Sequence, residues 1–419
     1  MVEEIAARLK KSHGLTRERL AVCAIHTHSA PMLTNVCPTL FGVPIPAEHQ
    51  KHIDRYTNEL TDALEKVAVA ALADRRPGQL EWAKGTVGFA ANRRTRGGVV
   101  DHDLPVLKVV CDGAVKALWV NYACHCTTLG GDFNKLHGDW AGAAQEFIER
   151  TYPGVTALVS IGCGADANPN PRPGVKFAEQ HGESIVREIG RLFPGEWTPL
   201  PPKIDVRFEK VELPFDKIPT REQWETLAKQ PGAIGYHAQY QLKKLDRGET
   251  LPTTISYPVQ TWTFGDKLTM VFLAGEVVVD YALRLKKEYA ADRIWVNGYS
   301  NDATCYIPSQ RILREGGYEG GGAMIYYDRP TKFAPAVEDV IFTALHKQIP
   351  PGFKAPKDPK EFPPPKSPED SRKCIQVKHG FNVELVAAEP LISSPVAIDW
   401  GTDGRLWVVE MYDYPTGVD

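Results

Sequence analysis

The chain has 419 residues and a net charge of −3, with 43% hydrophobic and 24% charged residues. This length allows two to three domains of about 150 residues each, and the mild acidity excludes the basic class of nucleic-acid-binding proteins. No run of about 18 apolar residues occurs, so the sequence predicts no transmembrane helix.

The two ends of the chain and the cysteines further narrow the class of protein. Residues 1–13 predict an amphipathic helix that ends at Gly14 and lacks the basic and apolar parts of a signal peptide. The strand-like run at 406–412 is followed by little sequence that could pair with it, and we expect a fragment at both ends. The eight cysteines include no Cys-x-x-Cys pair, which favours the interpretation that they are buried thiols. Cys124-His125-Cys126 remains a candidate metal-binding segment.

The first half of the chain alternates apolar runs with segments of helical periodicity. The turn residues Asp112-Gly113 predict a type I′ hairpin. In chain order after the first helix, the sequence predicts a buried strand at 20–25, a helix at 47–73, hairpin strands at 106–110 and 114–120, a helix at 140–152, a strand at 155–161 and a helix at 177–192.

The second half is less regular, and residues 196–260 give no clear pattern. Beyond them we expect a hairpin at 263–274, a helix from Gly275 to about 290, a strand at 293–297, a polar loop at 298–322 and a helix at 335–347. Eight prolines between 350 and 368 predict an extended linker.

These elements predict an α/β fold of mixed β-sheets flanked by helices. We expect one domain at 1–349, a proline-rich linker at 350–373 and a truncated β-rich stub at 374–419.

Polar side chains repeatedly follow the ends of predicted strands, where open α/β sheets usually place their sites. They are His26, His125, Asp166, Glu276 and Tyr306. This recurrence is the main argument from the residues alone for a catalytic domain.

Histidine and carboxylate candidates suit zinc, although each has a structural alternative. His26 and His28 would share a face of a strand, about 6.5 Å apart, or be ordinary loop histidines. Asp139 could orient a ligand histidine or cap a helix, and Glu276 could bind metal or favour a helix N-terminus.

Several other polar residues carry weaker signals. Arg93 and Arg94 could contact substrate or be solvated, and the tyrosines Tyr299, Tyr306 and Tyr318 in a glycine-rich loop could form a lid or pack on the surface. The turn at 162–169 is neither a phosphate loop nor a nucleophile elbow.

Taken together, these segments resemble the neutral/alkaline, non-lysosomal ceramidase family through about residue 349. The carrying motifs are Ala24-Ile-His-Thr-His-Ser-Ala-Pro31, Asn121-Tyr-Ala-Cys-His-Cys-Thr-Thr128 with His137-Gly-Asp139, Gly162-Cys-Gly-Ala-Asp-Ala-Asn-Pro169, Ala274-Gly-Glu276, and Tyr306-Ile-Pro-Ser with Tyr318-Glu-Gly.

The resemblance implies a zinc amidohydrolase that cleaves the N-acyl bond of ceramide or a ceramide-like lipid. It implies that zinc lowers the pKa of a water and polarises the amide carbonyl. The implied zinc ligands are His26, His125, Glu276 and Tyr306.

The remaining family positions imply roles around the substrate. Tyr318 matches a contact to the substrate carbonyl, His28 the histidine beside the metal and Arg93 a substrate-side arginine. Asn168 stands where the family motif Gly-Asp-x-Ser-Pro has its serine, so that hydroxyl is missing at this catalytic position. The first strand and glycine-rich opening of the family, and the immunoglobulin-like tail of its longer members, are also missing.

Residues 374–419 resemble the opening of the β-propeller "membrane-bound dehydrogenase" domains of planctomycete-type bacteria. Two alternatives to the ceramidase-like function are a zinc esterase or deacylase on another acyl substrate, and a non-catalytic sensing domain fused to a propeller. The family resemblance suggests a secreted or periplasmic protein and admits peripheral membrane contact.

Overall fold

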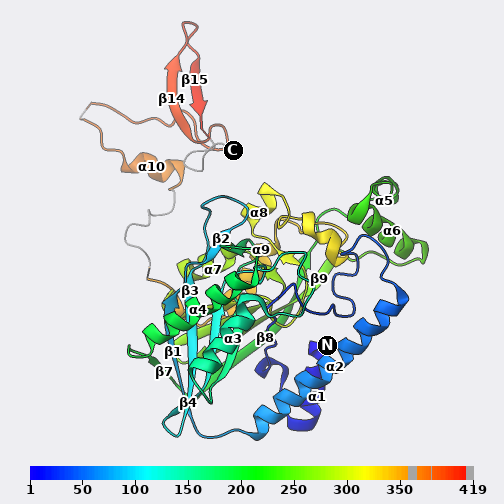
Figure 1. Cartoon of the computed structure of the whole chain (residues 1–419). Coiled ribbons are helices and arrows are strands. Elements are labelled where there is room, and N and C mark those ends of the chain that lie inside the picture. The colour runs from blue at the N-terminus through cyan, green and yellow to red at the C-terminus, as the bar shows by residue number, and fades with distance from the viewer. Residues whose placement is uncertain (357–365, 379, 412–419) are drawn as a thin grey trace. The chain divides into compact units, whose positions relative to one another are not determined.

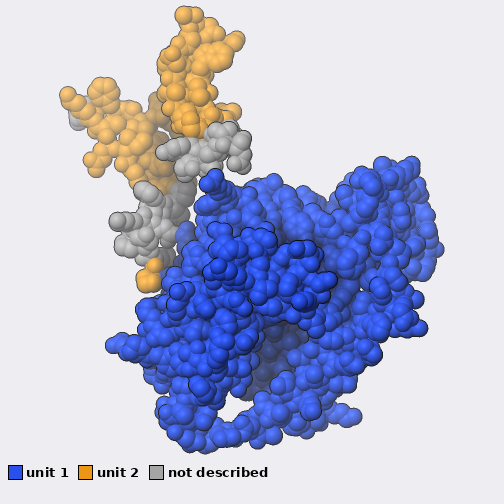
Figure 2. All heavy atoms as spheres, in the orientation of Figure 1, with its two compact units in different colours: residues 1–355 blue, residues 356–419 orange. Residues whose placement is uncertain are grey.

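The computed structural model describes residues 1–356, 366–378 and 380–411. The chain divides into two compact units, Met1–Ala355 and Pro356–Asp419 (Figure 2). Among the helices of the described residues, none is long and apolar enough to cross a membrane.

The first unit contains a five-stranded sheet whose outer face is covered by two helices (Figure 1). Its pairs are antiparallel except β4–β5, which is parallel. Asp112 and Gly113 both adopt positive φ, which confirms the predicted hairpin turn. The strands in spatial order are β5 (Thr156–Ile161), β4 (Ala114–Tyr122), β3 (Asp103–Cys111), β1 (Gln79–Thr86) and β7 (Thr198–Leu200), and the helices are α3 (Asp139–Thr151) and α4 (Val175–Leu192).

A second, four-stranded sheet packs against the first. Trp82 and Leu107 of the first sheet share one hydrophobic cluster with Met270 and Trp295 of the second, so the core lies between the sheets. The outer face of the second sheet packs against two more helices, giving a helix–sheet–sheet–helix order. The strands in spatial order are β12 (Ile294–Asn297), β10 (Leu268–Leu273), β9 (Thr254–Phe264) and β8 (Ile204–Pro214), and the helices are α7 (Val279–Glu288) and α9 (Val337–Gln348).

Short elements complete the first unit and shape its polar end. Two small sheets pair β11 (Glu276–Val277) with β13 (Tyr306–Ile307), and β2 (Ala90–Asn92) with β6 (Ala167–Pro169). The remaining elements are α1 (Val2–His13), η1 (Arg17–Arg19), α2 (Ala47–Ala73), α5 (Arg221–Leu227), α6 (Gly232–Asp246), α8 (Gln310–Glu315), η2 (Gly322–Tyr327) and η3 (Pro351–Phe353). The predicted mixed α/β fold is confirmed.

Three predicted elements were wrong in detail. Within the described part of the chain, residues 20–25 form no sheet strand. Their backbone pairs with 299–301, where positive φ at Tyr299 and Asn301 prevents a continuous ladder. The helix expected from Gly275 begins at Val279, because Glu276 is held in β11. The expected loop at 298–322 contains β13 and α8.

The proline-rich segment also departs from an extended chain. Pro351–Phe353 forms a short helix whose Phe353 side chain is buried in the first unit. The expected linker residues 357–365 lie outside the described residues. In the second unit, α10 (Pro368–Cys374) is followed by a hairpin of β14 (Pro395–Trp400) and β15 (Leu406–Glu410). Residues 412–419 of the expected stub also lie outside the described part.

The close packing of α3 on α4 depends on a glycine. A Cβ on Gly182 would lie 2.8 Å from the backbone nitrogen of Ala144, whereas a Cβ on Gly190 of the same helix would meet only the Tyr152 hydroxyl at 3.6 Å. We expect Gly182→Ala to lower the free energy of unfolding by about 1–3 kcal/mol, because the helices must separate.

Urea unfolding of the full chain measures this difference. Gly190→Ala is the matched control, and it should leave stability unchanged or raise it by up to about 1 kcal/mol through helix propensity. Equal midpoints for the two variants would contradict the packing argument.

Candidate metal centre

Polar residues following strands of both sheets converge at one end of the first unit. His125 follows β4, and Glu276 follows β10. The parallel pairing of β11 and β13 places Glu276 directly beside Tyr306. The strand-end pattern in the sequence therefore corresponds to a real cluster of side chains.

His125 is the most rigidly held member of the cluster. Its side chain is buried, and its Nδ1 lies 2.8 Å from the Gly164 carbonyl oxygen. A carbonyl can only accept, so Nδ1 carries the proton and Nε2 of the neutral ring presents a lone pair. That Nε2 lies 2.9 Å from Glu276 Oε2 and 3.3 Å from the Tyr306 hydroxyl.

Glu276 uses its two oxygens differently. Oε2 faces the histidines, 2.9 Å from His125 Nε2 and 3.3 Å from His26 Nε2. Oε1 accepts a hydrogen bond from the Tyr327 hydroxyl. Tyr327 therefore fixes the carboxylate so that one oxygen points into the cluster.

His26 and His28 reach the cluster from a tight turn rather than from a strand. His26 has a φ of 56°, in the left-handed region, and its Nε2 lies 3.2 Å from His28 Nε2. The turn is held from outside: the Thr27 hydroxyl donates to the His137 carbonyl, and the His137 N–H donates to the Ser29 carbonyl. The prediction that both histidines lie on one face of a strand was therefore wrong, because the backbone forms a turn here. The two imidazole rings nevertheless contact each other.

The donor set fits a divalent metal such as zinc. One nitrogen from each of His26, His28 and His125 lies within 4.8 Å of the other two. The unprotonated His125 Nε2 and the Glu276 carboxylate are hydrogen-bonding distance apart with no proton between them, an arrangement that a shared cation satisfies. Neutral imidazole and carboxylate are ligands that zinc prefers.

The pKa shifts within the buried cluster favour neutral histidines and an ionised Glu276. Burial lowers the pKa of His125 and lowers that of His28 to about 4. Burial alone would raise the pKa of Glu276, but the adjacent His26 and His125 outweigh it and hold that pKa well below its usual value. Neutral imidazoles beside an ionised carboxylate are the forms that bind metal.

Arg93 places a fixed positive charge beside the cluster. It follows β2, and its backbone N–H donates to the Asp166 carbonyl. Its guanidinium donates to the Tyr306 hydroxyl at 2.9 Å and to Glu319 at 2.7 Å. Glu319 is only 4% exposed and also pairs with Arg94, so the two arginines share one buried carboxylate.

The other candidate residues lie at different distances from this centre. Tyr318 is half exposed, with its ring 5.1 Å from that of Tyr306 and its pKa raised to about 12 by burial and Glu276. Asn168 lies on β6, where its side chain accepts from Thr127; no contact with the cluster is seen among the described residues. Asp139 accepts from the Leu129 and Trp140 N–H groups, and within the described part of the chain no hydrogen bond joins it to a ligand histidine.

Three residues of the centre were not assigned roles from the sequence. Tyr299, noted only as a loop tyrosine, stacks on His26 with ring centroids 5.0 Å apart. Tyr327 was missed, and Glu319 was quoted only as part of the Tyr318-Glu-Gly motif. The pair Tyr326-Tyr327 carries no distinguishing pattern, and Glu319 follows Tyr318 in a motif that pointed to the tyrosine alone.

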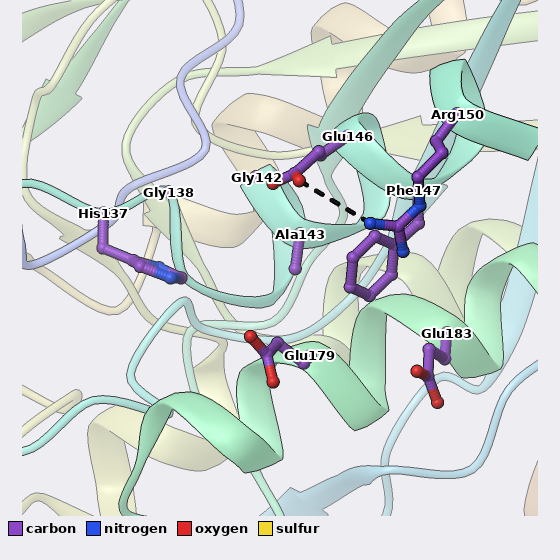
Figure 3. Close-up of a pocket in the computed structure, with 9 residues that line it drawn as sticks. All are labelled: His137, Gly138, Gly142, Ala143, Glu146, Phe147, Arg150, Glu179 and Glu183. Atoms are coloured by element: carbon purple, nitrogen blue, oxygen red, sulfur yellow. Dashed lines mark ion pairs between the residues drawn. The ribbon is translucent and has the colours of Figure 1, made fainter. Parts of the chain in front are cut away.

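A separate pocket of about 490 Å³ lies between α3 and α4. Figure 3 shows Glu146 and Arg150 from α3 and Glu179 and Glu183 from α4, with His137 at one end. None of His26, His125, Glu276 and Tyr306 lines it. The pocket is therefore distinct from the metal centre, and the His137 backbone bonds to Thr27 and Ser29 of the turn that carries the two histidines.

Comparison with solved structures identifies the class of fold. The chain is similar to neutral ceramidase from Pseudomonas aeruginosa, with a TM-score of 0.60 and 18% identity over 85% of this chain and 65% of that one. It is also similar to a ceramidase complexed with C2, with a TM-score of 0.62 and 16% identity over 95% of this chain and 71% of that one. The chain thus has the fold of neutral ceramidases and spans about two thirds of their length.

Sequence comparisons add information on the C-terminal part only. Residues 367–419 match a family described as "Domain of unknown function (DUF7133)". No curated protein sequence matches the chain.

Proposed function

We propose that the chain is a zinc-dependent amidohydrolase that cleaves the N-acyl bond of ceramide or a ceramide-like lipid. The observation that carries this proposal is the convergence of three imidazoles and one carboxylate within a ceramidase-like fold. His26, His125, Glu276 and Tyr306 would hold the metal. When bound, zinc supplies Lewis-acid polarisation of the amide carbonyl and activation of a water.

The chain's own residues then act on the substrate. Arg93 and Tyr318 donate toward the carbonyl oxygen as negative charge develops on it, which is the kind of preorganised stabilisation that contributes most to acyl transfer. His28, neutral and facing the cluster through Nε2, steadies the oxyanion together with Tyr318, and the proton of the attacking water moves to the leaving amine. Asp166 positions Arg93 by joining the turn after β5 to the end of β2 and the start of α7.

A zinc esterase or deacylase acting on another acyl substrate is the second candidate. Asn168 favours it, because no serine hydroxyl stands at the family position on β6.

We also propose that residues 1–349 form the hydrolase domain, 350–373 the linker and 374–419 the start of a β-propeller-like module. Ile398 and Trp400 on one face of the hairpin, and Trp407 and Val409 on the other, are exposed, as expected of strands that pack within a larger module.

Metal analysis and substrate release test this function. The full chain should contain one zinc and release fatty acid from N-acyl lipids; a chain that binds no metal would contradict both enzymatic candidates and favour the non-catalytic one. Release from O-acyl but not N-acyl substrates in a matched panel would select the esterase.

Tyr327→Phe tests the support of the ligand Glu276. The change leaves Oε1 without its tyrosine donor, and we expect zinc affinity to fall about 10–100-fold, as is typical for loss of an outer hydrogen bond to a metal ligand. Competition with a chelator measures this affinity. Tyr326→Phe is the matched control and should change it less than about twofold; equal losses would contradict the role of Tyr327.

A further inference from the structure

An exposed apolar patch lies on the segment that leaves the metal centre. It consists of Leu40, Phe41, Val43 and Ile234, which are 42%, 64%, 58% and 42% exposed; we name it the apolar collar. Contiguous exposed apolar side chains on a soluble domain mark sites of interaction. Four such side chains on one surface are unfavourably exposed to water, so a partner that covers them gains free energy from their burial.

The collar is continuous with the metal centre. Cys37 contacts the Tyr327 hydroxyl, which in turn bonds Glu276. Phe41 comes four residues later, so its Cα lies within about 14 Å of that of Cys37. A lipid held at the collar would thus lie a short distance from the proposed site of hydrolysis.

The backbone beneath the collar is fixed, so its side chains are held outward. The Thr39 side chain is fully buried and donates to the Ile325 carbonyl of η2. Gly42 packs on the first turn of α6, where a Cβ would approach Ala233 N to 2.9 Å. This contact brings the loop and Ile234 into one surface.

The composition of the collar selects its occupant. No charged residue occurs between Val36 and Pro46, nor between Pro231 and Tyr236 at the start of α6. A protein interface usually surrounds its apolar centre with a polar rim, whereas charged side chains are costly on a surface that enters lipid. We propose that the collar docks this chain on the surface of a lipid bilayer and delivers membrane-embedded substrate to the metal centre, an inference that rests on the proposed function.

Flotation of the full-length chain with neutral phosphatidylcholine vesicles tests the collar. The wild type should bind, and Phe41→Ser/Val43→Ser should bind at least about tenfold more weakly, because two apolar side chains no longer enter the lipid. Val67→Ser/Leu158→Ser removes two equally exposed apolar residues elsewhere and is the matched control. It should bind like the wild type.

Several results would overturn docking on lipid through the apolar collar. They are no binding of the wild type, equal losses in both double variants, binding only to anionic vesicles, and self-association of the wild type that the collar variant abolishes. Vesicle binding is measured on metal-stripped protein without turnover, so failure of the amidase proposal does not alter this readout. Hydrolysis of a soluble short-chain N-acyl substrate should be unchanged in the collar variant; a matching loss there would show that the loop shapes the site instead.

Discussion

Replacing His125 by alanine is expected to remove zinc from the chain and to lower amide hydrolysis at least about 10³-fold. His125 is the most rigidly held of the candidate ligands. Its Nδ1 donates a hydrogen bond to the Gly164 carbonyl, and its Nε2 points at the Glu276 carboxylate. Without the imidazole, Glu276 Oε2 loses its contact with the His125 nitrogen at 2.9 Å and keeps the contact with His26 Nε2 at 3.3 Å. Metal content by elemental analysis, measured together with fatty acid release, checks both effects.

The exposed histidine His49 on α2 offers the control. His49→Ala should keep one zinc per chain and full activity, because this side chain is exposed on the surface of α2. Retention of zinc and activity by the His125 variant would contradict the assignment of the centre.

Replacing Glu319 by alanine is expected to lower the free energy of unfolding by about 3 kcal/mol. This carboxylate is nearly fully buried and balances both Arg93 and Arg94 through 2.7 Å contacts. Removing it leaves two partly buried guanidinium groups without their shared partner. Because Arg93 also contacts Tyr306, its displacement should lower kcat/KM by about 10–100-fold even in protein that remains folded.

Urea unfolding and steady-state kinetics measure the two effects separately. Glu315→Ala is the matched control: this carboxylate pairs with Arg94 and Arg311 at the surface, and its loss should cost less than about 1 kcal/mol. An equal stability loss in both variants would show that burial of Glu319 adds nothing to the pair.

Much of the architecture could be predicted because it rests on short-range patterns. Asp112-Gly113 requires positive φ at both positions, and the turn formed as expected. The apolar runs of β5 and β10 and the periodicity of α2 and α4 likewise depend on neighbouring residues only. Family motifs extended this to His26, His125, Glu276 and Tyr306, and the structure brings these side chains together.

Other features depend on residues distant in sequence. Whether residues 20–25 become a strand depends on what lies beside them, and the twisted backbone at Tyr299 and Asn301 offers only a few hydrogen bonds. The roles of Tyr327 and Glu319 arise because the segment from β13 to η2 returns beside β11 and the end of β2. No local pattern marks either residue.

The sequence by itself determined an α/β chain of modest charge whose polar residues follow buried strands, and it located the candidate ligands. Local hydrogen-bonding and periodicity rules carry that information. Only the tertiary structure decided which oxygen of Glu276 faces the histidines, how Arg93 is balanced by Glu319, and that Phe41 and Val43 stay exposed beside Ile234. These features depend on how two sheets pack across a shared core, which brings together side chains separated by hundreds of residues.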